Sequence, residues 1–225
     1  RPETGGTTLL ASEITFIVDQ VDRPILWINN EEQDQKVILR CYCAYFGVSL
    51  PELVKNRQKY RQLYADRIGG RILFPEPTAL HRRDVERLCE AVHPSLIVID
   101  QLDKVKGFKN DRDDLELTAV YQWARELSKE VAPLIGVCQA SVTAEDKKYL
   151  TMDDVAGSKT GKQGEADWIL GIGKTHLPGM ENVRHFNMVK NKLVGDLDSN
   201  PSYRHGKADV LILPEIARYK DIGQK

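Results

Sequence analysis

The sequence predicts an α/β protein with a doubly wound, mostly parallel sheet, helices on both faces and an antiparallel C-terminal edge. Short runs of branched apolar residues, typical of buried parallel strands, alternate with helical segments through the first two thirds of the chain. In the last third, strands follow strands. The 225 residues suffice for one substantial core. We therefore expect residues 1–225 to form a single domain.

The first part of the chain supplies three helices and two strands. Residues 9–21 have apolar side chains at helical spacing, and a proline ends that helix. Residues 25–28 form a short apolar strand, and 35–47 form a helix that closes at a glycine. A charged helix covers 51–66, and after a Gly-Gly break a second strand covers 71–74.

The middle of the chain continues the alternation. Residues 81–92 are amphipathic and end at His-Pro, and 115–130 form a second long helix. Between them, 95–100 is an apolar run that ends in a carboxylate, and 134–138 is a further buried strand. These elements complete the parallel part of the predicted sheet.

The last third differs in composition. Residues 146–164 are polar and rich in lysine and glycine, so we expect this segment not to be rigid by itself. Strands are expected at 168–172, 185–189 and 210–213. Because no helices separate them, they are expected to pair antiparallel.

The bulk composition excludes several classes. A formal net charge of −1 means that nucleic acid could be bound only through local basic loops. The four cysteines lie in apolar runs without a CxxC pair, which predicts a reduced, cytoplasmic protein without a zinc site. No apolar run approaches the ~18 residues of a membrane span.

A glycine-rich turn precedes the first helix. A phosphate loop needs glycines so that backbone N–H groups can surround phosphate, a lysine to reach the β- and γ-phosphates, and a Ser or Thr for Mg²⁺. In the segment from Thr4 to Thr8, Gly5 would be the last glycine of this pattern, Gly6 would stand at the lysine position and Thr7 at the Mg²⁺ position. The same turn is also compatible with a plain helix cap.

Polar side chains follow three of the predicted strands. Asp100 ends the strongest strand, where a carboxylate can hold the water shell of Mg²⁺, although a turn-forming role is also possible. Glu31 follows the first strand and could activate a water molecule, with Glu32 as its rival. Gln139 follows the strand after Asp100 and could sense a γ-phosphate, or could simply be a polar strand end.

Taken together, these motifs resemble the motor domain of DnaB-like replicative DNA helicases, within the RecA-like P-loop ATPases. The resemblance rests on RPETGGTTLL, ILWINNEE, SLIVIDQLDKV, GVCQAS, GSKTGKQGEADWILGI and MVKNKLVGD, which follow in the family's order. It implies a RecA-like fold, ATP and Mg²⁺ as substrate and cofactor, and binding of single-stranded DNA. It also implies a homo-oligomeric ring, a hexamer, with a primase or a helicase loader as further partners, in bacterial or phage-infected cytoplasm.

The resemblance assigns roles residue by residue. Nucleotide would be bound by Thr4, Gly5, Gly6, Thr7, Thr8 and Asp100, and Mg²⁺ by Thr7 and Asp100. Catalytic roles fall to Glu31, Gln139 and the basic pair Lys190 and Lys192, which would reach a neighbouring subunit's site. The loop at 141–162 would contact DNA through Lys147, Lys148, Lys159 and Lys162, although solvated lysines are common in such loops.

Two departures from the family pattern bear on activity. Gly6 stands where the family has its phosphate-binding lysine, and Lys192 stands where it has an arginine. Loss of one preorganised donor costs about 2–4 kcal/mol of transition-state stabilisation. Two other functions therefore stay open: a recombinase or recombination mediator, and a degenerate subunit that binds nucleotide without hydrolysing it. We also expect sequence upstream of Arg1, including the first central strand.

Overall fold

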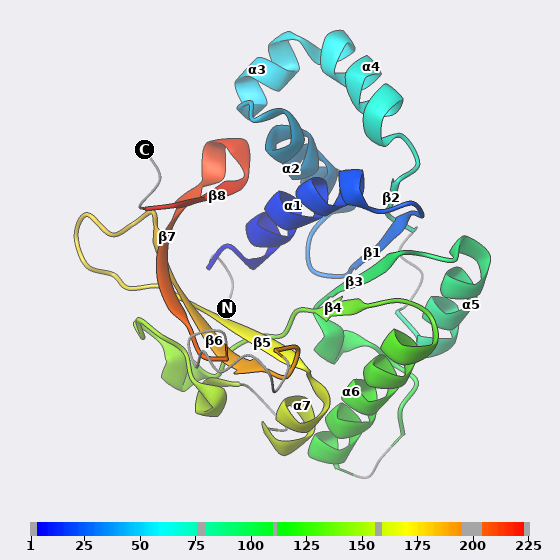
Figure 1. Cartoon of the computed structure of the whole chain (residues 1–225), viewed down its shortest axis with the longest axis vertical. Coiled ribbons are helices and arrows are strands. Elements are labelled where there is room, and N and C mark those ends of the chain that lie inside the picture. The colour runs from blue at the N-terminus through cyan, green and yellow to red at the C-terminus, as the bar shows by residue number, and fades with distance from the viewer. Residues whose placement is uncertain (1–3, 76–79, 110–111, 156–158, 195–203, 223–225) are drawn as a thin grey trace.

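Four short parallel strands form the centre of the molecule (Figure 1). The computed structural model describes residues 4–75, 80–109, 112–155, 159–194 and 204–222. The strands lie in the order β2-β1-β3-β4, and all their pairings are parallel. Their bounds are β1 Ile25–Asn29, β2 Ile72–Leu73, β3 Leu96–Asp100 and β4 Leu134–Gly136.

Both faces of this sheet are covered by helices, as the sequence predicted. Every residue of β1 and β3 is buried, and side chains that alternate along each strand face opposite layers. Trp27 and Val98 pack with α1 (Gly6–Ile17) and α2 (Asp34–Phe46). Ile28 and Ile99 pack on the other face with α5 (Arg82–Val92) and α6 (Asp113–Glu130). The result is a three-layer α/β/α arrangement.

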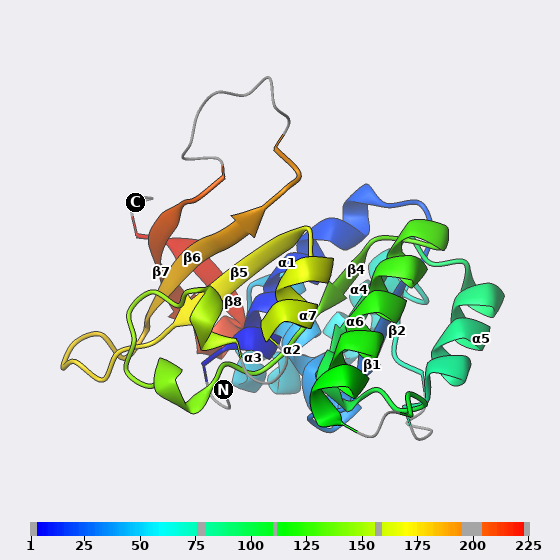
Figure 2. The ribbon, with the colours of Figure 1, turned by 90° about the horizontal axis from the view of Figure 1, so that it is seen from below.

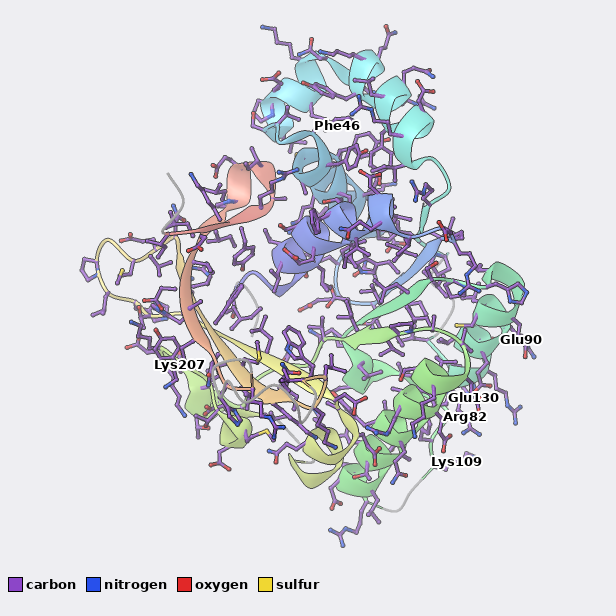
Figure 3. The ribbon with its side chains drawn as sticks, in the orientation of Figure 1. Phe46, Arg82, Glu90, Lys109, Glu130 and Lys207 are labelled. Atoms are coloured by element: carbon purple, nitrogen blue, oxygen red, sulfur yellow. The ribbon has the colours of Figure 1, made fainter. Side chains whose placement is uncertain are left out.

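The helix expected at 51–66 is two helices in the structure, α3 (Leu50–Lys55) and α4 (Arg57–Ile68). Asn56 between them has φ −114° and ψ 34°, which is not helical. Aromatic side chains hold this outer unit to α2: Tyr42 stacks on Tyr64 with ring centroids 3.8 Å apart, and Phe46, labelled in Figure 3, packs beside them. This aromatic contact replaces the single continuous helix as the source of local order.

The C-terminal strands form a second sheet, antiparallel throughout, in the order β5-β6-β7-β8. Within the described residues its backbone pairing is separate from that of the parallel sheet, whereas the sequence suggested an edge of the same sheet. Strand β8 was not expected, because RYKD is short and charged. The bounds are β5 Trp168–Gly173, β6 Val183–Asn191, β7 Lys207–Leu213 and β8 Arg218–Asp221.

The polar segment expected to lack rigid structure contains a short helix, α7 (Lys159–Glu165), which packs beside α6 (Figure 2). Arg125 of α6 holds it by an ion pair with Asp167 at 3.1 Å and by a hydrogen bond to the Glu165 carbonyl. Tertiary contacts therefore order a segment whose composition alone does not. No helix in the described ranges is both long and apolar enough to cross a membrane.

Candidate functional site

The first helix begins at Gly6, three residues earlier than the sequence indicated, so the glycine-rich turn leads directly into its first turn. Gly5 has φ +100°, a left-handed conformation that favours glycine. A Cβ at Gly5 would lie 2.4 Å from Tyr219 Oη, and that hydroxyl donates a hydrogen bond to the Gly5 carbonyl at 3.1 Å. The turn is thus held closely against β8. The N–H groups of the first helical turn have no helical partner, which suits an anion.

Thr7 and Asp100 meet at this helix end, although they are far apart in sequence. Thr7 Oγ1 donates a hydrogen bond to Asp100 Oδ2 at 3.1 Å. Asp100 is fully buried, and its Oδ1 atom has no hydrogen-bond partner among the described residues. Burial, and secondly the charge of Glu31, raise the pKa of Asp100 to about 6, while the Thr7 hydrogen bond lowers it.

These two oxygens fit a Mg²⁺ ion that arrives with a nucleotide. Mg²⁺ prefers oxygen ligands and is usually held by one or two protein groups together with phosphates and water. The described residues contain no cluster of three or more His, Cys, Asp or Glu side chains, so a cage made by the protein alone is absent there. The unpaired Asp100 oxygen is the observation that supports the fit.

Glu31 and Glu32 differ in their surroundings. Glu31 Oε2 accepts a hydrogen bond from the Gln101 side-chain amide at 2.8 Å, and its charge acts on Asp100. Glu32 instead forms an ion pair with Arg40 at 2.8 Å. Glu31 therefore has no cationic partner among the described residues, which suits a general base better than the neutralised Glu32 does.

Gln101 is a site residue that the sequence reasoning missed. It follows Asp100 directly and has φ +68°, which is unusual for a residue that is not glycine. Asn30 donates a hydrogen bond to its carbonyl at 3.0 Å while its side chain holds Glu31. The residue after the strand-terminal aspartate thus links the two carboxylates. Its position next to Asp100 was the signal available in the sequence.

A single large cavity brings the predicted motifs together. Its volume is about 1010 Å³, and its lining includes the turn from Thr4 to Thr8, Glu31, Asp100 and Gln139. The meeting of these segments follows from the parallel sheet, whose strands all place their carboxyl ends at the same edge. Strand β4 ends at Gly136, so Gln139 lies three residues past the strand and not at its last position.

The basic residues predicted to contact DNA are mostly engaged in ion pairs. Lys162 on α7 is 2% exposed and pairs with Asp103 at 2.5 Å, which leaves it no open surface in this conformation. Lys147 pairs with Asp154 at 2.7 Å, and Lys148 pairs with Asp209 at 3.0 Å. The side chain of Lys159 lies outside the described residues.

Lys190 and Lys192 are not part of the lining of the cavity that contains Asp100. Lys190 Nζ donates hydrogen bonds to the carbonyl of Gln163 and, at 3.5 Å, to that of Gly164, both on α7. Burial, and then the neighbouring charge of Lys192, lower the pKa of Lys190 from its ordinary value. Lys192 is exposed. The structure therefore does not bring these two lysines to the carboxylates of their own chain.

Comparison with known proteins bears on the fold. No protein-family model and no curated protein matches the chain. Among solved structures, the ATPase domain of a DnaB-like helicase superimposes with a TM-score of 0.77 at 14% identity, over 99% of this chain and 82% of that one. The fold is RecA-like. This RecA-like fold confirms the predicted fold class, and it places the phosphate-loop turn, Glu31 and Asp100 at the edge where such sheets bind ligands.

Proposed function

We propose that this chain is an ATP-dependent motor of the replicative DNA helicase type. The observation that carries the proposal is the meeting of Thr7, Asp100 and Glu31 at the N-terminus of α1. A hydroxyl and a carboxylate for a metal-bound nucleotide, with a second carboxylate beside them, are the groups that phosphoryl transfer to water requires. The likeness to the ATPase domain of a DnaB-like helicase supports the same conclusion at the level of fold.

Each residue has a chemical task in this proposal. The backbone N–H groups from Gly5 to Thr8 bind phosphate oxygens, and Thr7 and Asp100 bind Mg²⁺, which would neutralise charge on the phosphates. Glu31 accepts a proton from the attacking water molecule, while Gln101 fixes the orientation of its carboxylate. Gln139 contacts the γ-phosphate and transmits its presence to the loop at 141–162.

We further propose that single-stranded DNA is the polymer on which the motor moves, within a homo-oligomeric ring. Lys147 and Lys148 lie on the loop that would follow the DNA backbone, and exchange of their carboxylate partners for phosphates would preserve their ion pairing. Lys190 and Lys192 lie outside the cavity lining of their own chain, which is compatible with action on a neighbouring subunit's nucleotide.

We also propose that residues 1–225 belong to one ATPase domain whose two sheets are bridged by a further extended segment. Strands β4 and β5 each end a sheet, and both line the large cavity. Ile135, Val137, Ile169 and Leu170 are only half-buried there. An added apolar strand would cover these side chains and pair both edges.

The catalytic assignment is tested by comparing Glu31→Gln with Glu32→Gln. We expect Glu31→Gln to reduce DNA-stimulated ATP hydrolysis by about 10²-fold or more, the lower range for removal of a general base, while nucleotide affinity is kept. Glu32→Gln, which breaks only the pair with Arg40, should keep most of the activity. Equal losses in the two variants would exclude Glu31 as the base.

The absence of a lysine at position 6 favours a second candidate, a subunit that binds no nucleotide and serves assembly. The unaltered chain and Gly6→Lys, each titrated with Mg-ATP, separate the two functions. A motor requires saturable binding by the unaltered chain. If neither chain binds, the assembly role is the correct one.

A further inference from the structure

The cavity contains several buried or half-buried cations, and almost all are neutralised. Three of the four arginine and lysine side chains in its lining form ion pairs with carboxylates of the same chain. The pairs are Arg40 with Glu32 at 2.8 Å, Arg125 with Asp167 at 3.1 Å and Lys162 with Asp103 at 2.5 Å. The fourth cation, Arg184 on β6, has no carboxylate partner among the described residues.

Arg184 is only 5% exposed, and its guanidinium contacts backbone carbonyls alone. Nε donates to the Thr4 carbonyl at 2.7 Å, and Nη1 donates to those of Glu181 and Val183, each at 2.8 Å. Nη2 forms no hydrogen bond with the described residues, so part of its donor capacity is unused. A buried charge without a counter-ion is costly, and this cost is relieved when an anion binds beside it.

The position of Arg184 indicates which anion this would be. Its bond to Thr4 places the guanidinium next to the turn that enters α1, whose free N–H groups also attract negative charge. Burial lowers the pKa of Arg184 from its ordinary value, but arginine keeps its proton at any physiological pH. The positive end of the helix and a permanent cation therefore act on the same space.

Gly6 leaves this space open. Nothing lies within 4 Å of a Cβ built at Gly6, so neither a lysine nor any other side chain fills the position where phosphate loops carry their cation. The chain thus has an empty lysine position and, on β6, an unneutralised arginine that contacts the same turn.

We propose that Arg184 supplies the phosphate-binding positive charge that position 6 lacks, so that the nucleotide's terminal phosphates lie between the α1 N-terminus and β6. This inference rests on the proposed nucleotide-binding function. It assigns to β6 a binding role that the motif-based reasoning did not find, because Arg184 lies outside every motif. Its planar group can contact two phosphate oxygens at once, which a lysine cannot do.

The test measures dissociation constants for Mg-ATP, Mg-ADP and AMP by calorimetry. Arg184→Gln should weaken Mg-ATP binding roughly 10- to 100-fold, the scale of hydrogen bonds to charged groups, and should affect AMP far less. Gly6→Lys in the Arg184→Gln background should restore most of the loss. Arg218→Gln is the matched control, because Arg218 also contacts only backbone carbonyls, those of Ala44 and Tyr45, and lies outside the cavity.

A measurement that does not depend on folding of Arg184→Gln uses Gly6→Lys alone. If Arg184 already provides the charge, this substitution should change Mg-ATP affinity by less than about threefold; a gain of about tenfold, one charged hydrogen bond, would overturn the proposal. Unchanged affinity in a folded Arg184→Gln variant would also overturn it. Absence of Mg-ATP binding by the unaltered chain would instead contradict the proposed function itself.

Discussion

At the scale of single residues, the site is defined by two carboxylates that compete for charge. Asp100 is buried beside Glu31, and its pKa is raised from 3.8 to about 6 by burial first and by Glu31 second. Because the folded chain binds this proton more tightly than the unfolded chain does, the contribution of Asp100 to stability falls as the pH rises from 3.8 to about 6. Above that range the charged group destabilises the fold, and a bound cation would relieve the cost.

Asp100→Asn is therefore expected to stabilise the chain at neutral pH while it removes Mg²⁺-dependent activity. The shift corresponds to an upper limit of about 3 kcal/mol, which is a melting temperature higher by several degrees. The measurement is thermal unfolding at pH 4.5 and pH 7.5, and the gain should appear mainly at the higher pH. An identical change at both values would contradict the argument.

Asp154 provides a control of opposite sign. Burial raises its pKa, but hydrogen bonds from Lys147 and Thr151 outweigh this and leave the pKa below its ordinary value. Asp154→Asn should thus lower the melting temperature at neutral pH, where the carboxylate is stabilising. Two identical substitutions at buried aspartates should then differ in sign.

At the scale of elements, tertiary contacts decide which polar segments become ordered. Helix α7 was not expected, because its sequence KTGKQGE has two glycines and no apolar face. Lys162 nevertheless pairs with Asp103, which directly follows the β3 turn, and Tyr121 donates a hydrogen bond to the same carboxylate at 2.7 Å. This contact joins α7 and α6 to the segment that carries Asp100.

Lys162→Met tests this contact. Loss of one partner of a buried ion pair costs about 3 kcal/mol, because the other charge stays buried, and Asp103→Asn in the same chain should recover part of the loss. Urea unfolding measures both effects. Lys148→Met, which removes an exposed pair with Asp209, should cost much less. If Lys162→Met instead left stability unchanged and weakened DNA binding, Lys162 would be a DNA contact and not a link between elements.

At the scale of the whole molecule, the two sheets face each other across the cavity with unpaired edges. Val137 donates its backbone N–H to the Ile99 carbonyl at 3.0 Å, so the alternation of a parallel strand directs the Gly136 N–H to the outer edge. Gly136 is exposed, in contrast to the fully buried β3 beside it. The centre of the fold thus retains an open strand position.

Hydrogen exchange measured by NMR tests this arrangement. In the present chain the Gly136 amide should exchange much faster than that of Val137. An apolar strand fused before Arg1 should slow exchange at Gly136 and raise the melting temperature, because it would pair the free edges of β4 and β5. Equal protection of the two amides in the present chain would mean that this edge is already covered.

The sequence by itself determined the fold class and most of the strands, because runs such as ILWI and LIVID are apolar enough to be buried in any packing. It also indicated the polar residues that follow these strands, since parallel strands share one carboxyl edge. It missed α7, β8, Gln101 and Arg184, which depend on contacts with distant residues. Only the tertiary structure separated Glu31 from Glu32, because their distinction lies in Gln101 and Arg40, and only the folded chain brings those partners to them.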